Sequence, residues 1–166
     1  GDAMRRALKS TNPLERCAAL IALPQLIHTD VLPALLEPPG VLLEHSHEVV
    51  RKKAVMVLHR YHQLAPGSIA TRGEQLRRVL CDRDPAVMGA SLYLLHDIAE
   101  ADPSSQKDLV PSYVSILKQV TEHRLPTSFD YHRVPAPWIQ IKLLKLLATL
   151  GTADEAASAQ MYEVLY

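Results

Sequence analysis

Apolar residues recur at steps of three and four along most of this chain, a spacing that predicts amphipathic α-helices. The first helix is expected to begin after Asn12, with Pro13 at its first position, and Pro24 is expected to end or kink it near Leu23. Its buried face is expected to comprise five residues: Leu14, Cys17, Ala18, Leu20 and Ile21. The chain thus carries both a start signal and a stop signal for this helix.

The same spacing predicts further helices, separated by turn residues. They are expected at about residues 30–36, 41–43, 46–65, 68–81, 84–101, 103–120, 137–150 and 153–165. Pro38-Pro39-Gly40 is expected to break the helical pattern, and Pro111 to bend the helix that holds it. Residues 124–135 hold two prolines and no sustained period, which predicts the longest loop. No segment alternates convincingly as a β-strand does, so the pattern predicts an all-α fold.

Four of these helices begin alike, with a cap or a proline followed by an apolar run. The matching residues are Pro13, Glu48, Pro85 and Pro137, which lie 35, 37 and 52 residues apart. Helix pairs that repeat about every 35–47 residues are typical of an α-solenoid of the HEAT or armadillo kind. We therefore predict one α-solenoid (α-α superhelix) over residues 1–166 with no second domain. Neither end has a polar capping repeat, which suggests a fragment or a chain whose ends are covered by partners.

Composition narrows the class of protein. The 166 residues are 48% apolar, enough for a hydrophobic core, and no apolar run reaches the roughly 18 residues that a membrane span needs. The N-terminus lacks a signal-peptide pattern. Only two cysteines are present, Cys17 and Cys81, and both are expected to be small buried hydrophobes. These features indicate a soluble intracellular domain.

The formal net charge of zero conceals an uneven distribution. Residues 1–83 carry a net +4 and residues 84–166 a net −4. The main basic clusters are Arg51-Lys52-Lys53 and Arg77-Arg78, on consecutive predicted helices. A solvated helix face explains them most simply, and docking on an acidic protein or on anionic lipid is the alternative. Nucleic acid is disfavoured, because the net charge is zero and no aromatic residues interleave with these charges.

Polar side chains provide no set that we would assign to catalysis, a cofactor or a metal. The pairs considered are His45 with His47, His59 with His62, and Asp82 with Asp84. Neither histidine pair has a cysteine or carboxylate at ligand spacing. Asp84 precedes a proline and is expected to cap a helix, with Asp82 as a turn residue. No glycine-rich phosphate loop is present.

The only tryptophan follows a proline-rich run. Pro135 and Pro137 flank Ala136, and Trp138 begins a strongly apolar helix. We expect Pro135, Pro137 and Trp138 to form a structural anchor that holds the preceding loop against a buried helix.

Four stretches resemble, in order, the trunk of the large adaptin subunits of vesicle-coat adaptor complexes. They are residues 48–55 (EVVRKKAV), 81–92 (CDRDPAVMGASL), 129–144 (FDYHRVPAPWIQIKLL) and 161–165 (MYEVL). Alpha-class adaptins have a similar VPAPW element. The flanking YHR and IQI, with Leu150-Gly151 and MYE, favour the epsilon class, the large subunit of the fourth adaptor-protein complex.

The resemblance implies a partial trunk solenoid with a non-enzymatic scaffold role and no cofactor. It implies a cytoplasmic protein, peripheral on trans-Golgi network membranes and coated vesicles, that sorts cargo in intracellular protein transport. The implied partners are the second large, medium and small subunits, with an Arf-type GTPase for recruitment. No binding residue of the family is carried over to this chain. An unrelated HEAT-repeat protein-binding module, such as a transport receptor, is the alternative.

Overall fold

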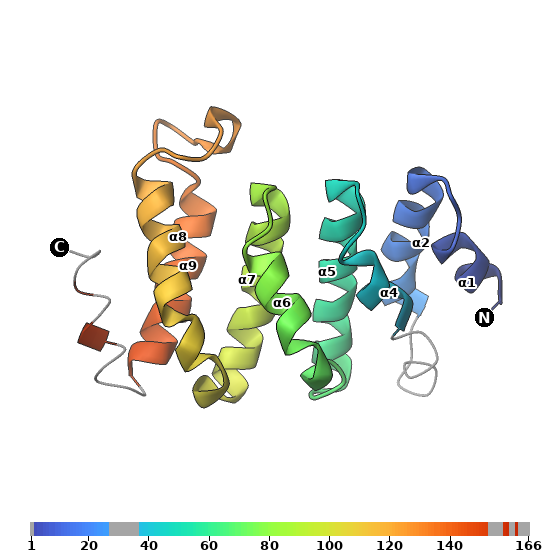
Figure 1. The fold of residues 1–166 in the computed structure, drawn as a ribbon, viewed down its shortest axis with the longest axis horizontal. Coiled ribbons are helices and arrows are strands. Elements are labelled where there is room, and N and C mark those ends of the chain that lie inside the picture. The colour runs from blue at the N-terminus through green and yellow to red at the C-terminus, as the bar shows by residue number, and fades with distance from the viewer. Residues whose placement is uncertain (1, 27–36, 153–157, 160–161, 163–166) are drawn as a thin grey trace. The chain divides into compact units, whose positions relative to one another are not determined.

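The computed structural model describes residues 2–26, 37–152, 158–159 and 162 (Figure 1). The chain divides into two compact units, residues 1–94 and 95–166, and the division falls within helix α7 (Pro85–Ala101). In the described ranges the regular structure is helical, apart from one isolated β-bridge between Tyr131 and Val134. None of the described helices is long and apolar enough to cross a membrane.

The first unit contains short and long helices in succession. They are α1 (Asp2–Leu8), α2 (Pro13–Leu26), α4 (Glu37–Leu42), α5 (Glu48–Leu64), the 3₁₀-helix η2 (Ala70–Arg72), α6 (Gly73–Leu80) and the first part of α7. Helix α2 packs against both α1 and α5, and α4 packs against α5. The buried residues of α5 include Val50, Leu58 and Tyr61, which places α5 at the core of this unit.

The second unit follows the last turns of α7. Its elements are the 3₁₀-helix η3 (Pro103–Leu109), α8 (Val110–Thr121), the 3₁₀-helix η4 (Thr127–Phe129) and α9 (Pro137–Gly151). Helices α8 and α9 pack together, and η3 contacts both. The apolar core here includes Leu117 and Val120 of α8 and Leu143 and Leu147 of α9.

A buried polar chain fixes η3 in place within the second unit. The Tyr113 hydroxyl donates to Gln106 Oε1 at 2.5 Å, and Gln106 Nε2 donates to the Leu95 carbonyl oxygen at 2.7 Å. Both side chains are buried, so each hydrogen bond satisfies a group that water does not reach.

Two predicted helix caps are confirmed. Asn12 Oδ1 accepts from the Leu14 N–H at 2.9 Å, and Asp84 Oδ1 accepts from the Ala86 N–H at 2.8 Å. Each cap supplies a partner for an N–H at the start of a helix, where no preceding carbonyl is in reach. A helix over Asp2–Leu8 was not expected from the sequence.

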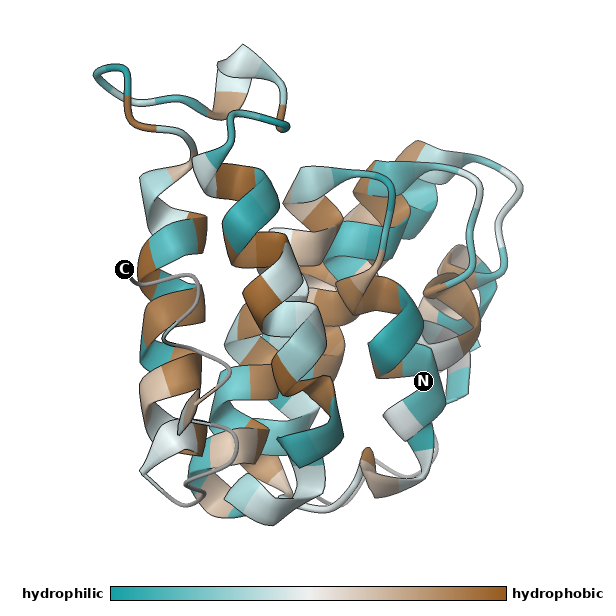
Figure 2. Ribbon diagram, turned by 60° about the vertical axis from the view of Figure 1, so that its left-hand side comes forward, coloured by the Kyte–Doolittle hydropathy of each residue, from teal (hydrophilic) through white to brown (hydrophobic). Residues whose placement is uncertain are grey.

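Of the predicted buried face of α2, only Leu20 is buried. Leu14 is 78% exposed, Ala18 and Ile21 are also exposed, and the buried residues are Ala19, Leu20 and Leu23. Helix α2 is apolar around much of its circumference, so periodicity alone does not decide which side faces the core. Figure 2 shows how brown apolar and teal polar residues are distributed around the other helices.

Prolines lie inside several helices rather than at their ends. Pro24 is within α2, which continues to Leu26, so α2 does not end near Leu23, the first of the two outcomes predicted for this proline. Pro38-Pro39-Gly40 does not interrupt α4 but lies within it, because the first turn of a helix does not need the N–H groups that proline lacks. Pro111 likewise lies in the first turn of α8, just after η3 ends.

Other predicted helices keep their place but differ in extent. The helix expected at 68–81 begins as η2 and becomes an α-helix only at Gly73. The stretch from Pro103 is a 3₁₀-helix up to Leu109. The helix predicted at 30–36 lies outside the described residues, as does most of that predicted at 153–165.

The predicted loop at 124–135 is confirmed as an irregular segment with an ordered tip. The N–H and carbonyl groups of Tyr131 and Val134 exchange two hydrogen bonds of 2.9 Å. The residues between them, His132 and Arg133, have φ angles of 49° and 68°. This is the conformation of a type I′ turn, which non-glycine residues adopt at a cost.

Candidate functional site

Arg51 lies inside the first unit rather than on its surface. Its Nε and Nη2 donate to the two carboxylate oxygens of Asp82 at 2.7 and 2.9 Å. Its Nη1 donates to the carbonyl oxygens of His45 and Ser46 at 2.8 and 3.0 Å. The residue is only 6% exposed. The expectation that Arg51 docks a partner is therefore corrected: its donors tie the start of α5 to the α6–α7 turn.

The contact between Arg51 and Asp82 shifts the pKa of both side chains. The hydrogen bond to Asp82 raises the pKa of the Arg51 guanidinium above its ordinary value. Burial by itself would raise the pKa of the Asp82 carboxyl, but hydrogen bonds from Arg51 and from the Asp84 N–H outweigh it and lower that pKa. Asp82, expected to be a turn residue, is therefore also the counter-ion of a buried cation.

A second buried guanidinium explains the sequence around Gly40. Arg72 Nη2 donates to Glu37 Oε2 at 3.0 Å, and Nη1 donates to Gln75 Oε1 at 2.9 Å. The guanidinium lies where a Cβ at Gly40 would be, so a larger residue there would collide with it. Gly40 thus permits the close approach of Arg72 to the backbone of α4.

The other basic candidates are at least partly exposed. Arg78 extends from α6 and pairs with Glu44 at 3.1 Å and with Glu74 at 3.8 Å. Lys52 and Lys53 on α5, and Arg77 on α6, are each partly exposed. The five predicted residues therefore include one buried structural cation and four that a partner can reach.

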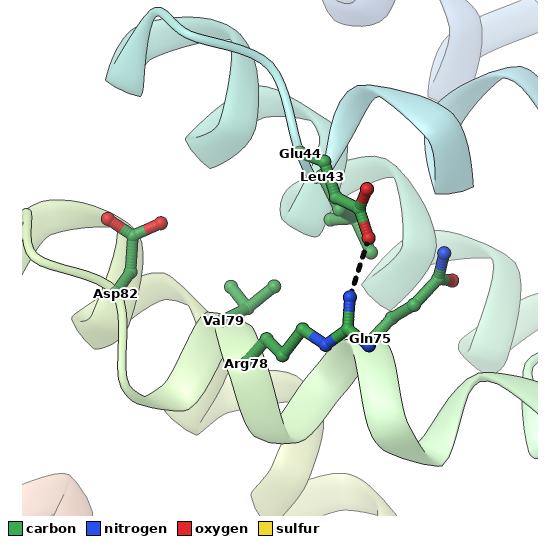
Figure 3. Close-up of a pocket in the computed structure, with 6 residues that line it drawn as sticks. All are labelled: Leu43, Glu44, Gln75, Arg78, Val79 and Asp82. Atoms are coloured by element: carbon green, nitrogen blue, oxygen red, sulfur yellow. Dashed lines mark hydrogen bonds and ion pairs between the residues drawn. The ribbon is translucent and has the colours of Figure 1, made fainter.

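A small cavity lies beside Arg78 in the first unit (Figure 3). Its volume is about 80 Å³, and its lining residues are Leu43, Glu44, Gln75, Arg78, Val79 and Asp82. Leu43 and Val79 are buried apolar residues, whereas Arg78 reaches across toward Glu44. This volume is well below the ~300 Å³ at which small-molecule pockets begin, so it suits one partner side chain rather than a metabolite.

The anchor predicted before α9 is built differently from the expectation. Pro135 and Ala136 are buried, Pro137 is the partly exposed first residue of α9, and Gln140 Nε2 donates to the Pro135 carbonyl oxygen at 2.5 Å. Trp138 is 45% exposed, so in this structure the buried part of the predicted anchor is Pro135 rather than the indole. Ile141, three residues later, is also exposed, because the core-facing side of α9 begins at Ile139.

The cysteines are more exposed than expected, and one of the predicted histidine pairs is stacked. Cys81 is exposed at the C-terminal end of α6 and Cys17 is partly exposed, so neither is the buried hydrophobe that was expected. The His45 and His47 rings stack with centroids 5.5 Å apart. Burial, followed by the charge of Arg16, lowers the pKa of His45.

One histidine with nearby carboxylates was missed in the sequence. His96 of α7 precedes Asp97 and lies four residues before Glu100. Side chains four residues apart in a helix lie one above the other, so the His-x-x-x-Glu spacing was the available signal.

Comparisons with known proteins show that the chain is similar to subunits of adaptor complexes. The family described as the adaptin N terminal region matches residues 2–166. The AP-4 complex subunit epsilon of Arabidopsis thaliana is 52% identical over 99% of this chain and 18% of its own length. The human AP-4 complex subunit epsilon-1 is 44% identical over 95% of the chain and 14% of its own length. The chain thus spans less than a fifth of these relatives.

A more distant relative provides a scale for these identities. The AP-1 complex subunit gamma of Dictyostelium discoideum is 32% identical over 75% of this chain and 14% of its own length.

Proposed function

Because the chain belongs to the adaptin family, we propose that it is part of the trunk of a large adaptin subunit of the epsilon class. The identity of 52% and 44% to two AP-4 epsilon subunits, against 32% to an AP-1 gamma subunit, supports this class. The all-α structure agrees with the helical-solenoid type of the family. The alternative of an unrelated HEAT-type module loses its support, since one family accounts for residues 2–166.

In this proposal the trunk is a non-enzymatic scaffold in a vesicle-coat adaptor complex. It holds a second large subunit, a medium subunit and a small subunit, and the complex sorts membrane cargo at the trans-Golgi network. The names of the relatives, which are subunits of AP-4 and AP-1 complexes, support a role in such an assembly. The complex is cytoplasmic and associates peripherally with membrane, with an Arf-type GTPase as the recruiting partner.

The four reachable basic residues are the proposed docking surface for an acidic face of another subunit. They are Lys52, Lys53, Arg77 and Arg78. Within the described part of the chain, Arg78 pairs with the exposed carboxylates of Glu44 and Glu74, and such surface pairs contribute at most about 1 kcal/mol. A carboxylate of the partner can replace Glu44 or Glu74 at little cost in free energy. The cavity beside Arg78 then receives a neighbouring side chain of the same partner.

Co-expression of the full-length subunit with the other three subunits tests this surface. Charge reversal of Arg77 and Arg78, or of Lys52 and Lys53, should reduce co-purification of at least one subunit and make the remainder more sensitive to salt. Arg60→Glu, on the exposed side of α5, is the matched control and should leave assembly unchanged. Intact assembly in both double variants would refute the docking surface. Intact assembly with lost vesicle binding would assign these residues to anionic lipid.

A further inference from the structure

Three potential metal ligands converge near the C-terminal end of α7. His96 Nδ1 lies 3.7 Å from Glu100 Oε2 and 4.0 Å from Asp97 Oδ1. One ligand atom from each residue lies within 4.8 Å of the other two. All three residues belong to the second unit, and the group is separate from the docking surface proposed above.

The separations fit a shared ion better than direct hydrogen bonds. An N–H···O hydrogen bond joins atoms about 2.7–3.2 Å apart, so neither carboxylate is within bonding distance of Nδ1. Two ligands of a tetrahedral zinc ion, each about 2.0–2.1 Å from it, lie about 3.4 Å apart. The observed separations of 3.7 Å for Glu100 and 4.0 Å for Asp97 exceed this value by about 0.3 and 0.6 Å, so both carboxylates need a small torsional change to bind such an ion.

The burial of the three side chains also suits a site with one fixed ligand. The His96 side chain is 11% exposed and Asp97 30%, whereas Glu100 is 61% exposed. The surrounding structure holds the imidazole, and Glu100, four residues along the same helix, is free to adjust its torsions around an ion. The site opens to solvent on the side of Glu100, so an ion has a path of access.

We propose that His96, Asp97 and Glu100 bind a transition-metal dication of the zinc type, with water in the fourth position. An imidazole nitrogen with two carboxylate oxygens is a borderline donor set that suits Zn²⁺, whereas Mg²⁺ and Ca²⁺ prefer oxygen ligands alone. The two carboxylates balance the charge of the dication. The bound ion joins the last two turns of α7, directly before Asp102, whose carboxylate caps η3.

Titration of the purified full chain with Zn²⁺, followed by calorimetry, tests the site. We expect one equivalent to bind with a rise in melting temperature, and a millimolar excess of Mg²⁺ should not displace it. Glu100→Gln removes a direct ligand, so its affinity should fall by more than the roughly 10-fold that loss of an outer-shell partner costs. Glu74→Gln, an exposed carboxylate of α6, is the matched control and should bind as the unmodified chain does.

His96→Gln should abolish the same equivalent. Because His96 is mostly buried and this variant can lose stability, Glu100→Gln and Asp97→Asn provide tests at more exposed positions. No zinc binding by the unmodified chain would overturn the proposal. Binding that is undiminished in Glu100→Gln and Asp97→Asn would also overturn it, since the ion would then lie on other histidines.

Discussion

The two units differ in the buried hydrogen bonds that hold their helices together: charged in the first unit and neutral in the second. Among the described residues of 1–94, the buried charged groups are the guanidinium groups of Arg51 and Arg72, each held by a carboxylate. In residues 95–166 the Tyr113–Gln106 pair is neutral and ends on a backbone carbonyl. A buried charge that loses its partner is far more costly than a neutral group that does so. The Arg51–Asp82 pair of the first unit is therefore expected to be more sensitive to mutation than the neutral Tyr113–Gln106 pair of the second.

The largest expected effect comes from removing the counter-ion of Arg51. Asp82→Ala leaves a buried guanidinium unpaired and should lower the free energy of unfolding by about 3–5 kcal/mol. Urea denaturation measures the loss, and Glu44→Ala, which breaks an exposed pair, should cost less than about 1 kcal/mol. Equal losses in the two variants would mean that burial does not distinguish these ion pairs.

The corresponding change in the second unit is smaller. Tyr113→Phe removes the hydroxyl that donates to Gln106 and leaves the buried Gln106 Oε1 without that hydrogen bond. The free energy of unfolding should fall by about 1–3 kcal/mol. Tyr131→Phe, at the exposed loop tip, is the control and should change stability by less than about 0.5 kcal/mol. If Tyr113→Phe lowered the free energy of unfolding as much as Asp82→Ala, the neutral pair would be as important for stability as the charged pair.

Gly40→Ala tests the second guanidinium of the first unit. The added methyl group displaces Arg72, whose flexible end can partly yield, so the expected cost is about 1–2 kcal/mol, at the low end for overpacking. Urea denaturation compares the stability of Gly40→Ala with that of Gly73→Ala, where an added Cβ meets no neighbour. The difference separates the collision with Arg72 from the general effect of replacing a glycine. A cost no greater at Gly40 than at Gly73 would contradict the packing of Arg72.

The smallest effect is a dependence of stability on acid. The pKa of Asp82 is lower in the folded state than in the unfolded chain, so its contribution is complete above the unfolded pKa of about 3.9 and is lost as the pH falls through the folded pKa. Denaturation from pH 6 downward should show a steeper decline for the unmodified chain than for Asp82→Asn. Parallel profiles would mean that Asp82 is not coupled to folding.

Local signals in the sequence identified most of the fold. Asn12 and Asp84 predicted helix starts that the structure confirms, because a cap acts on N–H groups two or three residues away. The face of α2 was not predictable, since that helix is apolar on several sides.

The candidate site depended on contacts that sequence spacing does not reveal. Arg51 looked like part of a surface cluster with Lys52 and Lys53, but its partner Asp82 is 31 residues away. Only the folded chain brings these two together. The exposure of Trp138 was not predictable for a related reason: an apolar run does not say which of its members face the core.

The central claim is that this chain belongs to a large subunit of a heterotetrameric adaptor complex. The most direct test is to purify the endogenous full-length protein under native conditions and to identify and count the chains that accompany it. The account predicts one copy each of a second large, a medium and a small adaptor subunit, in a particle of matching mass. A stable full-length protein that purifies without any adaptor subunit would contradict it.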